Sequence, residues 1–249
     1  FHGATRLNPT GRELLRDFPA SRLTLAAVSQ TLAMSLQDEL GIQVTALRSA
    51  FDPAAFQSAL LPREEARARL GLPGTEARVF GAVGRLVDST GVASLLEAFG
   101  RAAANHPDWR LVIVGEGPRR EALQARIAQP DLVDKVLLTG HLEDVATLYR
   151  AFDWVLIPSL DEGLGLILQE AVLAGVPVLA SELAVFREQL GDTGWYAPLN
   201  DEEGWSEAIG RAAQAPVGTV AAAQYRALAP DEAWSSFSQT ARELISGRQ

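Results

Sequence analysis

Residues 158–170 bring two glutamates and two glycines together in a short stretch of the chain. Gly163 and Gly165 have no Cβ, so the backbone at these positions can approach a ligand closely. The apolar run that follows predicts a helix, whose first turn offers unpaired N–H groups at a positive dipole end. Such an end suits a phosphate group or a sugar hydroxyl. Glu162 lies just before this expected helix, and Glu170 lies about two turns along it.

Each of these glutamates also has a structural interpretation. An acidic residue just before a helix stabilises the helix dipole, and this is the alternative role of Glu162. Glu170 lies on an otherwise apolar helix, where a buried carboxylate is costly unless it finds a donor. The alternative for Glu170 is therefore a structural hydrogen bond within the protein.

The surrounding pattern predicts an α/β fold with a doubly wound parallel sheet. From about residue 77 onward, short runs of Val, Leu and Ile alternate with helical patterns, which is typical of strands buried on both faces. The expected strands are 78–86, 109–114, 136–139, 154–158 and 176–180, and the expected helices are 92–105, 119–127, 145–151, 166–174 and 185–190. Such sheets bind ligands at the carboxyl ends of their strands. Arg85 occupies such an end, where its guanidinium would suit phosphate oxygens; the alternative is an ordinary surface arginine.

The chain divides into three expected parts. Residues 1–76 contain two short strands (23–28 and 42–47), a helix between them and a charged helical link, which is too little for a complete domain. Residues 77–220 form the expected ligand-binding, Rossmann-like domain. Residues 221–249 form helices that are broken at Pro230 and pack back toward the N-terminal side. The incomplete N-terminal part should leave an apolar patch, so we expect the chain either to self-associate or to belong to a longer one.

Composition excludes several classes of protein. The 249-residue chain has a formal net charge of -9, which disfavours nucleic acid as a partner. It has no cysteine, and its histidines (His2, His106 and His141) are far apart, so no metal site is expected. No apolar run is long enough to span a membrane. Residues 81–84 and 115–118 do not form the dinucleotide pattern Gly-x-Gly-x-x-Gly, so a nicotinamide enzyme is not expected.

The two glutamates around the Gly-x-Gly turn resemble the signature of the retaining group 1 (family four) glycosyltransferases, which have the GT-B fold. The resemblance continues through residues 171–181 and is also found at 84–87, 95–99, 112–118, 140 and 186–188. It covers nearly the whole chain from Arg22 onward and implies the donor-binding, C-terminal domain with a remnant of the acceptor domain. The implied activity is transfer of a hexose from a nucleotide-diphospho-sugar to an acceptor hydroxyl, with retention, in cell-envelope polysaccharide or glycolipid synthesis.

The resemblance implies a role for each candidate residue. Glu170 would bind the ribose hydroxyls, Glu162 would hold the donor sugar, and Arg85 would stabilise the diphosphate as it leaves. His2, on the acceptor side, would reach the donor sugar, so Glu162, Arg85 and His2 are the expected catalytic residues. The other donor-binding positions lie against the sugar and distal phosphate or against the base; they are Gly163, Leu164, Gly165 and Leu166, and then Gly140 and His141.

Two departures from the family pattern keep other functions open. The family has a lysine a few residues after the arginine, and this chain has Thr90 there, so one expected positive charge on the diphosphate is missing. Most of the acceptor domain is also absent. Both features favour the alternative of a non-catalytic or degenerate nucleotide-sugar-binding module. A second alternative is a sugar-nucleotide epimerase on a related fold, which the glutamate pair matches less well.

The expected partners follow from the resemblance. The donor substrate is a UDP- or GDP-linked sugar, with no cofactor and no metal, and the acceptor is a sugar or a lipid-linked molecule. We expect a cytoplasmic protein. A lipid-linked acceptor would bring it to the inner face of the membrane as a peripheral protein.

Overall fold

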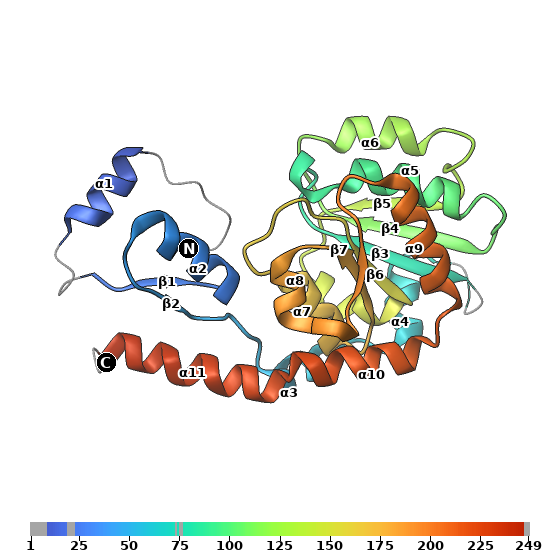
Figure 1. Ribbon diagram of the computed structural model, residues 1–249. Helices are drawn as coiled ribbons and strands as arrows, with labels where there is room; N and C mark the ends of the chain where they lie inside the picture. The colour runs from blue at the N-terminus through green and yellow to red at the C-terminus, as the bar shows by residue number, and fades with distance from the viewer. Residues whose placement is uncertain (1–8, 19–22, 73, 75–76, 247–249) are drawn as a thin grey trace.

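The computed structural model describes residues 9–18, 23–72, 74 and 77–246, which form two parts of unequal size (Figure 1). The larger part is a six-stranded parallel sheet with helices on both faces. The smaller part has a two-stranded parallel sheet, β1 (Leu25–Ala27) and β2 (Val44–Ala46), joined by α2 (Gln30–Leu40). The expected α/β fold class is therefore confirmed.

The six strands of the larger sheet follow the order β5-β4-β3-β6-β7-β8, and all neighbours are parallel. Their bounds are β3 (Arg78–Val83), β4 (Trp109–Val114), β5 (Val136–Gly140), β6 (Trp154–Ile157), β7 (Val178–Ser181) and β8 (Trp195–Ala197). The chain builds outward from β3 to β5, then returns to the other side of β3 and continues outward to β8. The strand order thus reverses between β3 and β6, which is where a doubly wound sheet opens a crevice for a ligand.

Helices cover both faces of this sheet because its strands are apolar on both sides. One face carries α5 (Val92–Ala102), α6 (Arg120–Ile127) and α9 (Glu202–Gln214). The other carries α4 (Arg63–Arg69), η3 (Val145–Ala151), α7 (Leu166–Leu173), α8 (Ala184–Leu190) and α10 (Val217–Leu228). The expected domain boundary at residue 220 therefore falls inside α10.

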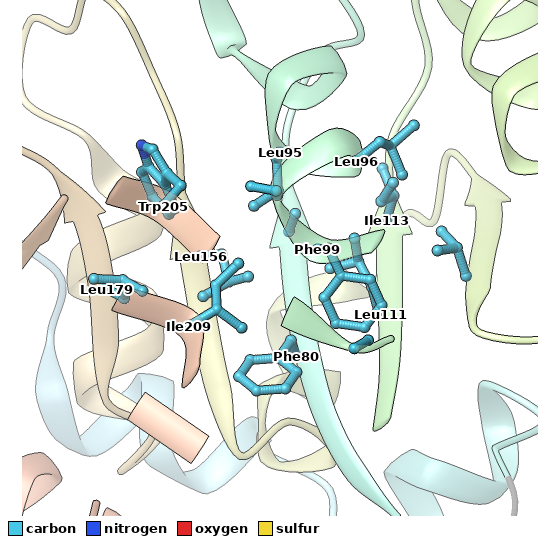
Figure 2. Packing of buried hydrophobic residues seen from close by; sticks show 14 of the residues in the cluster. Phe80, Leu95, Leu96, Phe99, Leu111, Ile113, Leu156, Leu179, Trp205 and Ile209 are labelled. Carbon is cyan, nitrogen blue, oxygen red and sulfur yellow. The ribbon is translucent and has the colours of Figure 1, made fainter. Parts of the chain in front are cut away.

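Large apolar side chains fix the strands against the first of these helical layers (Figure 2). Phe80 on β3 and Phe99 on α5 are fully buried, with ring centroids 5.9 Å apart in an edge-to-face arrangement. Trp205 on α9 is also buried in this cluster. Each side chain of this kind contributes roughly 1.5–3 kcal/mol by burial. The strand ends that carry the candidate residues are therefore held by a rigid core.

The other helical segments lie at the ends of the chain, in the linker or as single turns within the larger part. They are α1 (Pro9–Asp17), α3 (Pro53–Ala59), η2 (Asp88–Thr90), η4 (Gly191–Thr193) and α11 (Pro230–Ser246). The break expected at Pro230 is confirmed, because α11 begins there, and Figure 1 shows α11 running beneath the smaller part. No helix within the described ranges has both the length and the apolar character to cross a bilayer.

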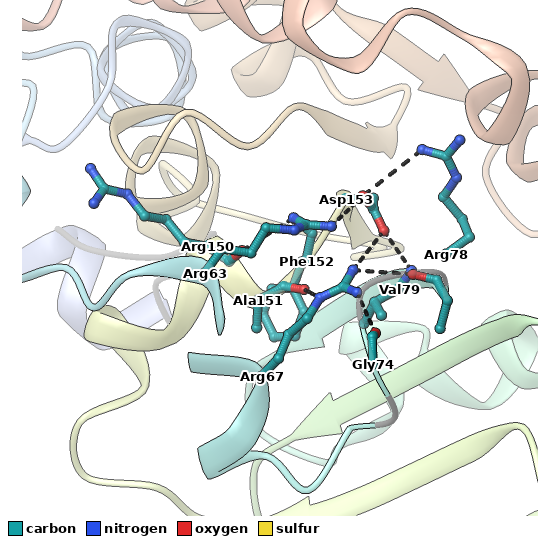
Figure 3. Close-up of polar contacts among 10 residues, drawn as sticks. Arg63, Arg67, Gly74, Arg78, Val79, Arg150, Ala151, Phe152 and Asp153 are labelled. Atoms are coloured by element: carbon teal, nitrogen blue, oxygen red, sulfur yellow. Dashed lines mark hydrogen bonds and ion pairs between the residues drawn. The ribbon is translucent and has the colours of Figure 1, made fainter. Parts of the chain in front are cut away.

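A buried arginine anchors the link between the parts (Figure 3). Arg67 on α4 donates to the carbonyl oxygens of Ala151 (3.0 Å) and Ala77 (3.1 Å) and to Asp153 Oδ2 (3.1 Å). Asp153 Oδ2 also accepts from the backbone N–H of Val79 at 2.7 Å. Burial lowers the pKa of Arg67, and Asp153 opposes that shift. This network lies at the amino ends of β3 and β6, away from the crevice, and its role is structural.

Candidate functional site

A cavity of about 310 Å³ opens between the carboxyl ends of β3 and β6, at the reversal of strand order. Gly84 and Arg85 line it on the β3 side, and Ser159 and Glu162 line it on the β6 side. Cavities of this size accommodate small molecules. The position is the one at which open α/β sheets bind their ligands.

A second cavity of about 260 Å³ extends from the first toward the smaller part of the molecule. Its lining includes Val28 and Ser49 from the smaller part and its linker, and Leu164 and Gly165 from the larger part. Glu162 lines both cavities, so it lies where they adjoin. A ligand that extends from one cavity to the other would therefore pass Glu162.

The backbone of residues 163–165, here called the glycine loop, leads into α7. Gly165 has φ +79°, and a Cβ on it would lie 2.4 Å from Cε1 of Phe186, so only glycine fits. Among the residues that the structure describes, no side chain caps the N-terminus of α7. Within the described residues, the N–H groups of Leu164 and Gly165 have no acceptor. The loop and the first turn of α7 thus present unpaired donors and a positive dipole end.

Glu162 is half-buried beside these donors. Ser159 Oγ donates to Glu162 Oε1 at 3.1 Å. Burial raises the pKa of the Glu162 carboxyl, Asp161 raises it further, and the hydrogen bond from Ser159 opposes both. The bond from Ser159 holds the carboxylate in a defined orientation at the residue that the two cavities share.

Replacing Glu162 with glutamine is expected to raise the stability of the chain, and to raise it more at neutral pH than at acidic pH. The folded chain holds the Glu162 proton to a higher pH than the unfolded chain does, because the folded pKa is raised. Protonated Glu162 therefore contributes stability that is fully present below the pKa of the unfolded chain and is lost as pH rises through the pKa of the folded chain. Glutamine does not ionise, so the variant does not lose this stability at neutral pH. Urea unfolding at several points between about pH 4.5 and pH 7.5 measures the difference between variant and wild type. Glu203→Gln removes an exposed carboxylate on α9 and should not reproduce the trend.

Glu170 lies on α7 with its carboxylate half-buried. The hydroxyl of Tyr149 donates to Glu170 Oε2 at 2.6 Å, and Tyr149 is fully buried. Burial raises the pKa of Glu170, and the bond from Tyr149 opposes that shift. Burial and the nearby carboxylate both raise the pKa of Tyr149 well above its usual range. Glu170 does not line either cavity, so its contact with a ribose stays a prediction, while the alternative hydrogen bond within the protein is present.

Arg85 is exposed, and its side chain has no ion-pair or hydrogen-bond partner in the described residues. It is the one cation among the described residues that line the first cavity, where Asp161 and Glu162 are the acids. The hydroxyl of Thr90 donates to the carbonyl oxygens of Arg85 (2.9 Å) and Val87 (2.7 Å), which stabilises the turn. Thr90 therefore shapes the loop that carries Arg85 and supplies no second charge.

The remaining expected residues are farther from the cavities. Gly140 ends β5 with φ +83°, and a Cβ on it would lie 2.8 Å from Glu116 Oε1, which pairs with Arg120 Nη1 at 2.6 Å. His141 is exposed beside it, and neither residue lines the two cavities. Their place at the same edge of the sheet leaves the base-binding role a prediction. His2 lies outside the described residues.

Several side chains that hold this site were not anticipated from the sequence. Ser29 and Gln189 donate to carbonyl oxygens of the glycine loop, and Tyr149 donates to Glu170. Only Ser29 had a signal, since its type and its place before a helix predict an N-cap; its hydroxyl does accept from the N–H of Leu32 at 3.2 Å. Nothing in the local sequence indicates its second contact, with the loop.

Comparison with known proteins agrees with this architecture. A family model described as glycosyl transferases group 1 matches residues 77–215. The chain is 32% identical over 161 residues to 2-deoxystreptamine glucosyltransferase of Streptomyces kanamyceticus, covering 63% of this chain and 42% of the relative. It is 31% identical over 202 residues to phosphatidyl-myo-inositol mannosyltransferase of Mycolicibacterium smegmatis, covering 79% and 50%. The chain thus spans half or less of the length of these relatives.

Solved structures show the same fold at lower identity. A glycosyltransferase from Rickettsia africae superposes with a TM-score of 0.83 at 17% identity, over 100% of this chain and 70% of that one. Anabaena HepE, solved in complex with UDP, superposes with a TM-score of 0.82 at 20% identity, over 97% and 69%. These matches give no support to the epimerase alternative. Because the family match spans more than half of its residues, the chain belongs to the group 1 glycosyltransferases.

Proposed function

We propose that the chain binds a nucleotide-diphospho-sugar at the carboxyl ends of β3 and β6 and takes part in transferring the sugar to an acceptor hydroxyl. One observation carries the proposal: Arg85 and the N–H groups of Leu164 and Gly165, which have no partner among the described residues, line two adjoining cavities that share Glu162. Phosphate oxygens suit both kinds of donor. Neighbouring structures of HepE were solved with UDP and with UDP-glucose, which supports a donor of this class.

In this proposal each part of the donor has a place. The diphosphate lies against Arg85, and the sugar lies by Glu162 and the glycine loop. As the bond from the sugar to the phosphate oxygen breaks, its electron pair passes to that oxygen, where Arg85 and the N–H groups offset the growing charge. The acceptor oxygen bonds to the sugar on the same face, giving retention, and its proton passes to the leaving phosphate. The names of the relatives support an acceptor from glycolipid, polysaccharide or lipopolysaccharide synthesis.

A second candidate function is binding of the nucleotide-sugar without transfer. It is favoured by the lining of the first cavity, in which Arg85 is the one cation among the described residues. A single charge together with backbone donors could hold a diphosphate yet stabilise its departure too weakly for turnover. Nucleotide binding without donor hydrolysis or transfer would support this candidate.

Glu170→Ala is expected to weaken nucleotide binding about ten-fold, or about 1.4 kcal/mol. The reason is that the carboxylate would accept hydrogen bonds from the ribose hydroxyls with the oxygen that Tyr149 leaves free. Calorimetric titration with UDP, GDP and ADP identifies the base, and titration of the variant measures the loss. The proposal fails if the wild-type chain binds none of the three.

Two further measurements separate the ribose contact from a structural role of Glu170. Tyr149→Phe removes the hydroxyl donor and keeps the carboxylate, so it should weaken binding less than Glu170→Ala does. A nucleotide without ribose hydroxyls, such as 2′,3′-dideoxy-UDP, should bind wild type and Glu170→Ala about equally. If both variants lose stability and bind UDP as the wild type does, Glu170 has only its structural bond.

A further inference from the structure

Two carbonyl oxygens of the glycine loop are held by buried side chains. Ser29 Oγ donates to the Gly163 oxygen at 2.6 Å, and Gln189 Nε2 donates to the Leu164 oxygen at 2.6 Å. Ser29 belongs to the smaller part and Gln189 to α8, and both side chains are almost completely buried. The loop is thus held on its core side from two directions.

Holding these carbonyls also fixes the N–H groups that follow them. A trans peptide unit is planar, and its C=O and N–H bonds point in opposite directions. The bond to the Gly163 oxygen therefore turns the N–H of Leu164 away from the core, and the bond to the Leu164 oxygen does the same for the N–H of Gly165. Both residues line the second cavity, and both N–H groups lack an acceptor in the described residues.

A second buried amide connects this support to the linker between the two parts. Gln169 Nε2 donates to Gln189 Oε1 and to the carbonyl oxygen of Ser49, both at 3.0 Å. Gln169 and Gln189 are each about 97–98% buried, where unpaired amide groups would be costly. Ser49 lies between β2 and α3, on the chain that leads from the smaller part into the larger one. A continuous line of hydrogen bonds therefore runs from the linker through both amides to the glycine loop.

We infer that Gln189 is a positioning residue that orients the N–H of Gly165 in the glycine loop, and that Gln169 couples this orientation to the linker. Neither residue lines either of the two cavities. The inference rests on the proposed function for the identity of the ligand, a nucleotide-diphospho-sugar. The hydrogen-bond line itself can be tested without any ligand.

Amide relaxation of the free protein tests the line directly. In wild type, the amides of Leu164 and Gly165 should be rigid, with order parameters of about 0.85. In Gln189→Leu the order parameter of the Gly165 amide should fall below about 0.6, because Ser29 still holds the peptide unit of Leu164. Gln224→Leu is a matched control, because Gln224 is fully buried and bonds both the N–H (2.7 Å) and the oxygen (2.9 Å) of Val178, away from the loop. It should lose similar stability and leave the loop rigid. Unchanged order parameters in Gln189→Leu would overturn the inference, whatever the chain binds.

Titration with chosen nucleotides tests the positioning role. Gln189→Leu should bind UDP-glucose or GDP-mannose, whichever the wild type binds, about ten-fold more weakly, and should bind UMP or GMP as the wild type does, because the monophosphates lack the distal phosphate and the sugar. Gln169→Leu keeps the bond to the Leu164 oxygen, so its affinity for the sugar nucleotide should fall only about two- to three-fold. Gln224→Leu should bind the sugar nucleotide with the affinity of the wild type.

Equal losses of affinity for the monophosphate and for the sugar nucleotide in Gln189→Leu would show a merely structural effect and overturn the positioning role. A wild-type chain that binds none of these nucleotides overturns the proposed function, and the relaxation data then decide the hydrogen-bond line separately.

Discussion

Replacing Arg85 with alanine is expected to weaken the affinity for UDP or GDP about 10- to 100-fold and to slow sugar transfer about 10²- to 10³-fold. Arg85 is the one cation among the described residues that line the first cavity, and its guanidinium has no partner there. Its charge is therefore available to a diphosphate without breaking an existing ion pair. A larger effect on transfer than on binding follows because charge on the diphosphate grows as the sugar leaves.

Titration with UDP and with uridine, each at low and high salt, checks this expectation. The affinity for UDP should fall on loss of Arg85 and the affinity for uridine should not, and the affinity for UDP should depend less on salt in the variant than in the wild type. Arg119→Ala is the matched control, since Arg119 is a nearby arginine already paired with both carboxylate oxygens of Asp88, at 2.5 and 2.6 Å. Equal losses in the two variants would show a general effect of net charge and contradict the specific role of Arg85. The affinity of Arg85→Lys for UDP should lie between those of the wild type and Arg85→Ala, because lysine keeps the positive charge but loses the bidentate geometry of the guanidinium.

The fold could be predicted largely because its strands are buried on both faces. Such strands appear as continuous apolar runs, and the expected strand at 109–114 coincides with β4. The expected strand at 78–86 extends three residues beyond β3, because Leu86 is apolar and buried although the strand already ends at Val83. β8 was missed because an edge strand of three residues, Trp195–Ala197, is too short to show a periodic pattern.

The candidate site was predictable only where its residues are close in the sequence. Glu162, Gly165 and Glu170 lie within a single stretch, so their types and spacing were enough to suggest ligand chemistry. Their supports come from elsewhere: Ser29 is 134 residues from Gly163, and Gln189 is 25 residues from Leu164. A glutamine on a helix gives no sign of facing another glutamine until the helices are packed. The sequence therefore indicates which groups could meet a ligand, and the packing determines how they are oriented.

Gly165→Ala is expected to lower the free energy of unfolding by about 2 to 5 kcal/mol, from two separate causes. The residue has φ +79°, a conformation that alanine rarely adopts. Its new Cβ would also lie 2.4 Å from the ring of Phe186, which is fully buried in the core and cannot move aside cheaply. Urea unfolding of the variant and the wild type measures the sum of the two costs.

Gly175→Ala separates these causes, because Gly175 follows the other end of α7 with the same φ of +79° and nothing within 4 Å of its Cβ position. This control should lose only the backbone cost, about 1 kcal/mol, and the excess loss in Gly165→Ala then measures the contact with Phe186. Since the displaced backbone is the glycine loop, Gly165→Ala should also weaken binding of the sugar nucleotide, whereas Gly175→Ala should not. Equal stability losses and equal affinities in the two variants would mean that the loop can shift without cost. The close approach of Gly165 to Phe186 would then not be what fixes the N–H groups at the cavity.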